Sequence, residues 1–266
     1  MKRYRAILAY NGSAYFGYQR QPEHPTVQAA VEEALEKVLG VKTVVRAAGR
    51  TDTGVHATGQ VIAFDAVWKH GEATLLKAVN VYLPEDIALQ TLVQHDDFHP
   101  RYDALSRTYR YAVVVVNVRQ PLLAKRAWQL HTELDEQRLQ EAAALLIGEH
   151  DFAAFGTPPK GDNTVRLVYR SQWQPMTLEG VAGYTYEVEA TAFLYHMVRR
   201  IVGSLVAVGR GQISLQAFET MFRSADLSQN KWMAPPQGLV LTSVRYPAPG
   251  EDSPRRTRVE REPHAT

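Results

Sequence analysis

The pattern of apolar and polar positions in the first hundred residues predicts short strands and two helices. Apolar or alternating runs predict strands at residues 4–10, 41–47, 60–65 and 87–93. The longer helix is expected to begin at Thr26, whose hydroxyl suits an N-cap, and to stop at Gly40. Its apolar positions fall on one stripe, formed by Val27, Val31, Ala34, Leu35 and Val38. A shorter helix is expected at residues 73–80.

The second half, from about residue 105, shows a similar order of elements. Strands are predicted at residues 108–116, 165–176, 184–192 and 238–246, and those at 165–176 and 184–192 are expected to pair. Helices are predicted at residues 135–146, 195–208 and 215–222. Residues 152–163 form a loop that contains two consecutive prolines. Residues 248–266 are rich in Pro, Arg and Glu and have almost no apolar content, which predicts a disordered tail.

Neither half alternates strand and helix strictly enough for a doubly wound parallel sheet. The order of elements favours an α+β fold with a mostly antiparallel sheet. We therefore expect an N-terminal half at residues 1–104, a C-terminal half at 105–247 and the tail at 248–266. The similar order in the two halves suggests duplication, although no residue-level repeat supports it.

Composition indicates an ordinary globular protein. Of the 266 residues, 45% are hydrophobic and 22% are charged, so a core of useful size is available. No apolar run reaches the roughly 18 residues of a membrane-spanning helix, and no apolar signal region follows Met1. The absence of cysteine excludes disulfides, thiol nucleophiles and Cys-ligated metals. A cytoplasmic location is therefore expected.

The distribution of charge is more informative than the formal net charge of +2. Basic residues gather in clusters that include Arg101, Arg107 and Arg110, Lys125 and Arg126, and Arg199 and Arg200. Tyrosines at 102, 109 and 111 alternate with the first cluster. Cations that hold phosphates and rings that stack on bases suit RNA recognition. A solvated strand face with extended arginine side chains explains the same pattern equally well.

Candidate chemistry is concentrated in residues 49–60. Asp52 lies between two threonines, with Arg50 two residues before it and His56 four residues after it. Glycines at 49, 54 and 59 allow backbone angles and close approaches that other residues forbid. A polar loop next to a strand is a common place for reactive groups. Thr-Asp-Thr-Gly is also ordinary turn chemistry, so a purely structural role stays open.

This loop resembles the signature of the tRNA pseudouridine synthase A family, Gly-Arg-Thr-Asp-Ala-Gly-Val-His, except that Thr53 replaces Ala. Further segments match the family in order, at residues 10–12 and 15–19, 80–87, 98–101, 107–111, 192–199, 201–203 and 238–239. Tyr18 replaces the usual Trp of the family. The resemblance extends over residues 4–246.

The resemblance implies an enzyme that isomerises uridine to pseudouridine in tRNA, acting on the anticodon arm. It implies that Asp52 is the nucleophile, that Tyr109 lies at the target base, and that Arg199 is the cation beside Asp52. It also implies a homodimer without cofactor or metal. The implied fold has two related ferredoxin-like halves, one continuous antiparallel sheet with helices on one side, and a central active-site cleft.

The residue types suit this reaction. The N1–C1′ bond breaks and a C5–C1′ bond forms, without redox change or group donor. A carboxylate can attack C1′ or C6, or remove the 2′ proton, and the sequence does not choose among these routes. At about 100° per residue, Arg199 lies at the edge of a buried helical stripe, while Arg200 is expected to face solvent. A structural ion pair of Arg199 with another acid is the alternative.

Other residues are expected to contact the substrate. Tyr109 can stack on an extruded uracil, although an ordinary strand tyrosine is the alternative. The candidates for phosphate or loop contacts are Arg50, His56, Arg101, Arg107 and Arg110, and Leu239 belongs to a matched segment. His56 lacks a second ligand at helical spacing, so a metal site is not expected.

Two rival functions stay open. One is an inactive RNA-binding protein of this fold, and the other is a glycoside hydrolase, which would need a second carboxylate about 5–10 Å away.

Overall fold

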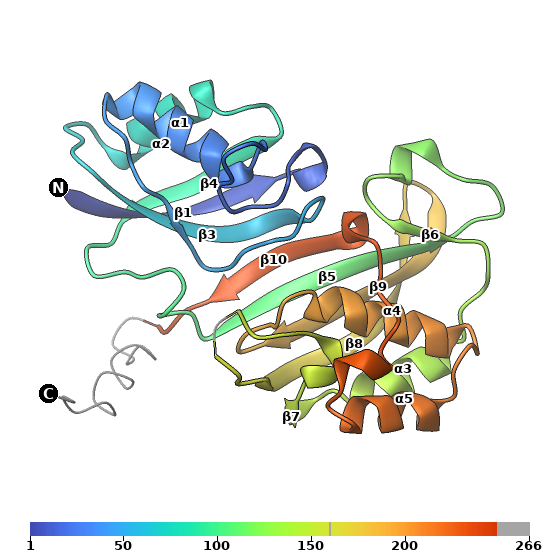
Figure 1. Ribbon diagram of the computed structural model, residues 1–266. Helices are drawn as coiled ribbons and strands as arrows, with labels where there is room; N and C mark the ends of the chain where they lie inside the picture. Colours follow the sequence, from blue (N-terminus) through green and yellow to red (C-terminus); the bar gives the residue numbers. More distant parts are fainter. Residues whose placement is uncertain (160, 249–266) are drawn as a thin grey trace, which may run out of the picture. The chain divides into compact units, whose positions relative to one another are not determined.

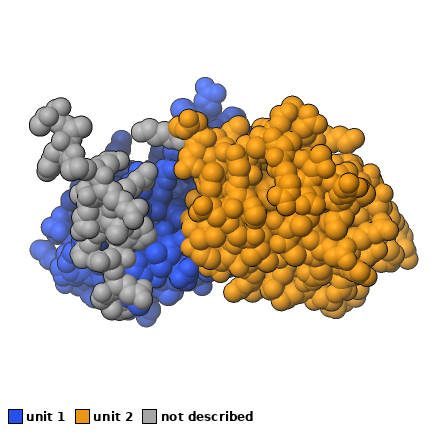
Figure 2. Space-filling view, turned by 90° about the horizontal axis from the view of Figure 1, so that it is seen from below, with its two compact units in different colours: residues 1–107, 241–266 blue, residues 108–240 orange. Residues whose placement is uncertain are grey.

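The structure is a computed structural model that describes residues 1–159 and 161–248. It divides into two compact units, coloured separately in Figure 2. Unit 1 comprises residues 1–107 and 241–266, and unit 2 comprises residues 108–240. The first boundary lies close to the expected one at 104/105, whereas residues from Leu241 onward group with unit 1 instead of the second half. Apart from Ala248, the predicted disordered tail lies outside the described residues.

Unit 1 contains an antiparallel arrangement of strands in the order β4, β1, β3, β10. These strands are β4 (Ile87–Gln94), β1 (Lys2–Tyr10), β3 (His56–Ala66) and β10 (Leu239–Arg245), and the short β2 (Arg46–Ala47) pairs with β3. Every second residue of β1 is buried from Tyr4 to Tyr10, as an alternating strand requires. Tyr4 pairs with Phe64 and Leu8 with Gln60, and the register of β1 on β3 then shifts before Tyr10, which pairs with Ala57.

Two helices cover one face of these strands, α1 (Val27–Leu39) and α2 (Glu72–Tyr82), as Figure 1 shows. The predicted ends of α1 are confirmed. The Thr26 hydroxyl accepts the Ala29 N–H at 3.4 Å, and Gly40 adopts a left-handed φ of 72°. Asn80 on α2 bonds both backbone groups of Leu89 on β4, at 2.9 and 2.8 Å, and so ties the helix to the sheet.

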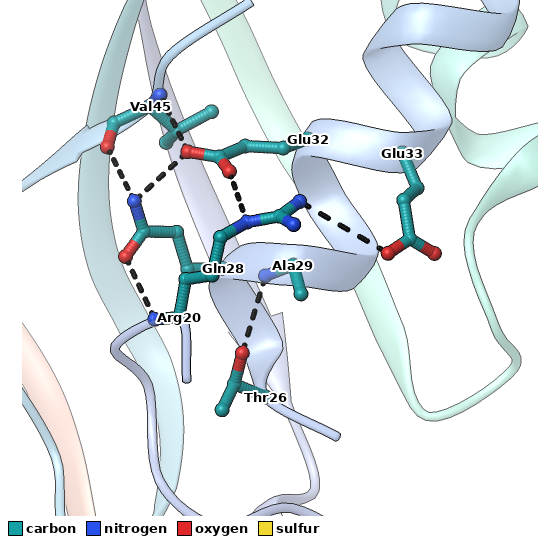
Figure 3. A network of polar contacts seen from close by, with 7 residues as sticks. All are labelled: Arg20, Thr26, Gln28, Ala29, Glu32, Glu33 and Val45. Carbon is teal, nitrogen blue, oxygen red and sulfur yellow. Dashed lines mark hydrogen bonds and ion pairs between the residues drawn. The ribbon is translucent and has the colours of Figure 1, made fainter. Parts of the chain in front are cut away.

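The strand predicted at residues 41–47 is wrong over residues 41–45, and side chains of α1 explain the loss of Val45. Glu32 accepts the Val45 N–H at 3.1 Å, and the Gln28 amide donates to the Val45 carbonyl at 3.2 Å (Figure 3). Arg20 completes this network through its 2.7 Å ion pair with Glu32. Because α1 takes both backbone groups of Val45, that residue is not part of the strand ladder.

Unit 2 is built on strands in the order β5, β9, β8, β7. They are β5 (Ser106–Val115), β9 (Val181–Ala190), β8 (Val165–Leu178) and β7 (Gly148–Asp151), with β6 (Trp128–Leu130) parallel to β5. The predicted pairing of β8 with β9 is confirmed. Their two-residue turn places Glu179 at φ 48° and Gly180 at φ 79°, as a tight hairpin needs.

The helices of unit 2 are α3 (Glu136–Ala144), α4 (Met197–Gly209) and α5 (Leu215–Arg223) (Figure 1). Eleven of the thirteen residues of α4 are buried, which makes it the central helix of this unit. It begins two residues later than predicted. Tyr195 instead bonds to Thr157, through its N–H to the Thr157 carbonyl at 2.9 Å, and His196 takes a left-handed φ of 61°.

Short 3₁₀ turns occupy residues Gly12–Ala14, Pro121–Leu123, Ala153–Phe155, Leu227–Gln229 and Pro236–Gly238. Within the described residues, the elements form an α+β fold with a mostly antiparallel ten-stranded sheet, so the expected fold class is confirmed. No helix within residues 1–159 or 161–248 has the length and apolar character that crossing a bilayer requires.

Candidate active site

Asp52 lies on a tight turn of unit 1 between β2 and β3. Its side chain is half-buried, between the buried residues Thr51 and Val55. The Val55 N–H donates to the Asp52 carbonyl at 3.1 Å, and Gly54 closes the turn with a left-handed φ of 78°. The backbone of the turn is thereby fixed while the carboxylate keeps partial access to solvent.

A second loop, residues 11–18, packs against this turn backbone to backbone. The Tyr18 N–H donates to the Thr51 carbonyl at 3.0 Å. A Cβ at Gly12 would lie 1.9 Å from the Val55 carbonyl oxygen, and one at Gly17 would lie 2.8 Å from the Thr51 carbonyl oxygen. Both positions therefore require glycine, since no side chain fits between the two loops.

Buried polar side chains of the neighbouring strands form hydrogen bonds with the loop that carries Asp52. The Tyr10 hydroxyl is 2.8 Å from the Thr51 hydroxyl, and the Gln60 amide donates to the Gly49 carbonyl at 2.8 Å. Burial raises the pKa of Tyr10 to about 12, and its hydrogen bonds with Thr51 and Gln60 oppose that rise only in part. Tyr10 is therefore a neutral phenol near pH 7, and the contact with Thr51 is a stable structural one.

His56, the first residue of β3, is engaged through its ring. Its Nδ1 accepts the Gly12 N–H at 3.0 Å. A nitrogen that accepts a hydrogen bond carries no proton, so this contact selects the neutral imidazole. His56 thus helps to join the two loops, and a role as a charged phosphate ligand would need this bond to break.

The two arginines predicted near the loop differ in their surroundings. Arg50 is exposed. Arg107 donates to the carbonyls of Ala48, Arg101 and Ala104, at 3.1, 2.8 and 3.5 Å. The bond to Ala48 holds the backbone immediately before Gly49, so Arg107 links residues 101–104 to the start of the Asp52 loop.

Tyr109 lies on β5 within unit 2 and is only 8% exposed. Its ring meets the Phe193 ring edge to face, with centroids 5.1 Å apart and an interplanar angle of 86°. This contact fixes the plane of the Tyr109 ring. A fixed ring plane is what stacking on a base requires.

Arg199 lies near the start of α4 and is half-buried. Its Nε donates to the Ala234 carbonyl at 2.9 Å, and the Ala234 N–H donates to the Arg199 carbonyl at 2.9 Å. The side chain is therefore held in one direction by the segment that follows α5. That restraint lowers the entropy lost when the guanidinium meets an anion.

The expectation that Arg200 faces solvent is wrong. Arg200 is half-buried and donates to the Asn230 carbonyl at 3.0 Å, because residues 230–234 pack along that side of α4. Burial, followed by the charge of Arg199, lowers the pKa of Arg200 from its ordinary value. Helical periodicity alone does not reveal this covering segment, which comes from a different part of the chain.

Leu239 is buried at the start of β10. It follows Gly238, where a Cβ would lie 2.7 Å from the Tyr111 ring. The Tyr111 hydroxyl donates to the Pro235 carbonyl at 2.7 Å. The segment that carries Leu239 is thus packed closely on β5, the strand of Tyr109.

Arg110, a candidate for RNA contact, is committed to an ion pair. It contacts Glu187 at 2.6 Å, and Arg170 contacts the same carboxylate. Burial of Glu187 favours a raised pKa, but hydrogen bonds from Arg170 and Arg110 outweigh it, and the net pKa is lowered. An acid on the neighbouring strand therefore neutralises part of the predicted basic cluster.

Two structural features of the site are not evident from the pattern of the sequence. Tyr10 and Gln60 support the turn from buried strand positions, where ordinary alternation hides their role. Phe16 is 45% exposed and stacks on His24, with ring centroids 4.2 Å apart. An aromatic residue inside a glycine-rich loop was the available signal for Phe16.

The predicted residues therefore divide between the units. Asp52, Arg50, His56 and Arg107 belong to unit 1, and Tyr109, Arg199 and Leu239 belong to unit 2. Among residues 1–159 and 161–248, no group of three or more His, Asp or Glu side chains is arranged to hold a metal ion.

Comparison with known proteins identifies relatives over most of the chain. The family described as tRNA pseudouridine synthase matches residues 6–103 and 142–247. A protein named tRNA pseudouridine synthase A from Geobacter sp. (strain M21) is 40% identical over 250 residues, which cover 93% of this chain and 100% of that protein. Proteins of the same name are 40% identical in Neisseria meningitidis serogroup B, covering 92% of each chain, and 42% identical in Shewanella amazonensis, covering 90% and 91%.

Proposed function

The chain belongs to the tRNA pseudouridine synthase family, and we propose that it isomerises uridine in the anticodon stem-loop of tRNA with Asp52 as nucleophile and without a cofactor. Membership makes it an isomerase that forms pseudouridine in tRNA. The observation that carries the assignment of Asp52 is its position on a rigid turn. Buried contacts fix the backbone there while the side chain keeps access to solvent.

Asp52 meets the chemical demands of the reaction. The base must leave C1′ through its N1, turn, and return through C5, which then loses its proton. A carboxylate can attack C1′ or C6, or remove the 2′ proton, and each route needs an ionised group close to the sugar or base. The turn holds the backbone of Asp52 in one conformation, and such pre-organisation lowers the entropy lost in reaching the transition state.

Arg199 is proposed to act with Asp52 as its cation. An arginine beside the carboxylate keeps it charged when the substrate excludes water. The bonds between Arg199 and Ala234 support this role, because they hold the guanidinium in place. The alternative, a purely structural arginine, is tested by Arg199→Lys. That substitution keeps the charge but loses the planar fork of donors.

Tyr109 is proposed to stack on the extruded uracil. Extrusion of a nucleotide costs a few kcal/mol, and stacking on an aromatic ring offsets about 1–3 kcal/mol. The edge-to-face contact with Phe193 supports this role by fixing the ring plane. Leu239 is proposed to border the same base.

The remaining assignments concern RNA and assembly. Arg50 is proposed to contact phosphate, His56 and Arg107 to keep the turn in place near the RNA, and the enzyme to work as a cytoplasmic homodimer. The exposure of Arg50 supports a phosphate contact. The bonds of His56 and Arg107 to backbone groups support their role in holding the turn. Because phosphate contacts release counterions, tRNA binding should weaken steeply as salt rises.

The decisive variant is Asp52→Asn, which keeps the shape of the side chain and removes its charge. We expect tritium release from C5-labelled uridine in tRNA to fall by at least about 10³-fold, while tRNA binding stays within about threefold of wild type. Asp96→Asn, at an exposed aspartate of unit 1, is the matched control and should retain full activity. Near-normal tritium release by Asp52→Asn would refute the assignment.

A further inference from the structure

Unit 2 contains a hollow that the proposed reaction does not use. Its volume is about 210 Å³, and it lies between the C-terminal half of α4, strand β6 and residues 231–233. Trp128, Trp232 and Met233 contribute its large apolar surfaces, and Arg210 and Lys231 contribute its charges. Of the described residues that line the hollow, none is acidic.

The outer wall of the hollow is a short arch, residues 231–233, that is fixed at both ends. At one end, the buried Asn230 accepts the Trp232 N–H at 3.0 Å and the Ser204 hydroxyl at 3.2 Å, and donates to the Ala154 carbonyl at 3.1 Å. At the other end, Ala234 exchanges hydrogen bonds with Arg199. Because both ends are fixed, the hollow exists before any ligand binds.

The backbone of α4 leaves room for this arch. A Cβ at Gly203 would lie 2.7 Å from the Met233 nitrogen and 2.9 Å from the Ala234 nitrogen. Glycine at 203 thus allows residues 233–234 to lie directly on the helix. The arch is an ordered part of the fold and not a loose loop, so its exposed side chains have defined positions.

The chemistry of the lining selects an anionic ligand with a flat aromatic part. The Lys231 ammonium lies 5.1 Å from the centre of the Trp232 ring. The Arg210 Nε is buried and makes no hydrogen bond to any of the described residues, while its Nη2 donates weakly to the Thr132 hydroxyl at 3.4 Å. A buried donor without a partner is unfavourable unless a ligand or water supplies an acceptor.

The size of the hollow limits the kind of ligand that it can hold. Pockets for free small molecules usually measure about 300–1,000 Å³, which is larger than this one. A hollow of about 210 Å³ suits one group inserted from a larger partner. Aromatic rings beside cations are the usual means of binding single, unstacked nucleotides.

We propose that this hollow binds one unstacked nucleotide of the RNA substrate, with its base against Trp232 and its phosphate near Arg210 and Lys231. This proposal rests on the proposed tRNA function and adds a contact surface remote in sequence from the Asp52 loop. It predicts that the hollow contributes to tRNA affinity and leaves the chemical step unchanged.

The test is equilibrium binding of an unmodified tRNA transcript to the full chain, together with single-turnover tritium release at saturating enzyme. Trp232→Leu should weaken binding roughly 5- to 100-fold, the range for loss of one stacked base, with the single-turnover rate unchanged. Trp232→Phe should restore most of the affinity, because a phenyl ring still stacks. Lys231→Gln should lower the slope of log affinity against log salt by about one.

Controls separate this proposal from its alternatives. Trp68→Leu and Lys69→Gln, in unit 1, are the matched controls and should bind tRNA as wild type does. Melting curves establish that each variant is folded. Quenching of tryptophan fluorescence by tRNA provides a second measure of contact with Trp232, and we expect less quenching in folded Trp232→Phe. Titration with free adenosine monophosphate tests whether the hollow is a site for small nucleotides. Light scattering of wild type and Trp232→Leu tests whether the hollow is a contact with a second copy of the chain.

Wild-type affinity of Trp232→Leu for tRNA would overturn the proposal while leaving the proposed function intact. Saturable binding of the free nucleotide with unchanged tRNA affinity would overturn it as well, as would loss of a dimer in Trp232→Leu. Failure of the proposed function is recognisable separately, because wild-type protein would then release no tritium, whether or not it binds the transcript.

Discussion

At the scale of single residues, the site depends on the hydrogen bonds that hold the polar groups of the Asp52 turn. Asp52 is carried by a turn whose carbonyls and hydroxyls are bonded to buried partners, among them Tyr10 and Gln60. The sequence indicated Asp52 through the density of reactive residues around it. Tyr10 lies in a matched segment, but its supporting role was not readable, because a tyrosine in an alternating strand has the same pattern whether or not its hydroxyl supports a catalytic loop.

Tyr10 provides a test through pH. Burial raises its pKa from 10.0 in the unfolded chain to about 12, so the folded protein keeps a proton that the unfolded chain loses. Stability from this group is complete below pH 10 and is lost as pH rises through about 12. The fall amounts to on the order of 2–3 kcal/mol of unfolding free energy.

Tyr10→Phe should remove this part of the pH dependence. It should also destabilise the protein at pH 7 by about 1–3 kcal/mol, because the buried Thr51 hydroxyl loses its partner. Urea unfolding at several pH values measures both effects. Tyr82→Phe, at a half-exposed tyrosine, serves as control. An unchanged slope above pH 10 in Tyr10→Phe would show that this tyrosine is not the titrating group.

At the scale of elements, periodicity and capping predicted most helices and strands, and competition from side chains accounts for the main failures. Thr26 and Gly40 set the ends of α1 because their roles are local. The strand expected at 41–47 is shortened because Glu32 and Gln28, distant in sequence, take the backbone groups of Val45. Arg200 was expected to face solvent because its own helix does not show that a segment thirty residues further on covers it. Contacts of this kind cannot be read from a local window.

Close packing of the 11–18 loop on the Asp52 turn gives a test at this scale. Gly12→Ala would place a methyl group 1.9 Å from the Val55 carbonyl oxygen, so one of the two loops must move. We expect destabilisation of about 1–3 kcal/mol and a larger loss of turnover than of tRNA binding. Gly71→Ala is the matched control, because a Cβ there meets no atom within 4 Å among the described residues. Normal turnover by Gly12→Ala would mean that the position of the turn is not critical.

At the scale of the whole molecule, the ordered series of short motifs identified the family before any contact was known, and matches over residues 6–103 and 142–247 confirm it. The pattern of elements was sufficient for the fold class. The division of the chain was less readable, because residues from Leu241 group with the N-terminal unit although they follow the second half. The grouping of these C-terminal residues with unit 1 depends on strand pairing between residues far apart in the sequence, which the pattern of a single sequence does not reveal.

The C-terminal residues give a prediction at this scale. Residues 248–266 are rich in Pro, Arg and Glu, and the family match ends at 247. Deletion of residues 249–266 should leave tritium release from labelled tRNA near that of wild type. The deletion removes four arginines and four acidic residues and so leaves the net charge unchanged, and measurements at two salt concentrations test whether the arginines contact phosphate. A large loss of affinity at low salt would mean that these residues contact RNA.

The most direct measurement of the central claim is position-resolved sequencing of pseudouridine in tRNA treated with wild-type enzyme and with Asp52→Asn. The account predicts new pseudouridines in the anticodon stem-loop with wild-type enzyme and none with the variant, although both proteins bind the RNA. Pseudouridine formed at the same positions by Asp52→Asn would contradict the account, as would modification confined to other parts of the tRNA.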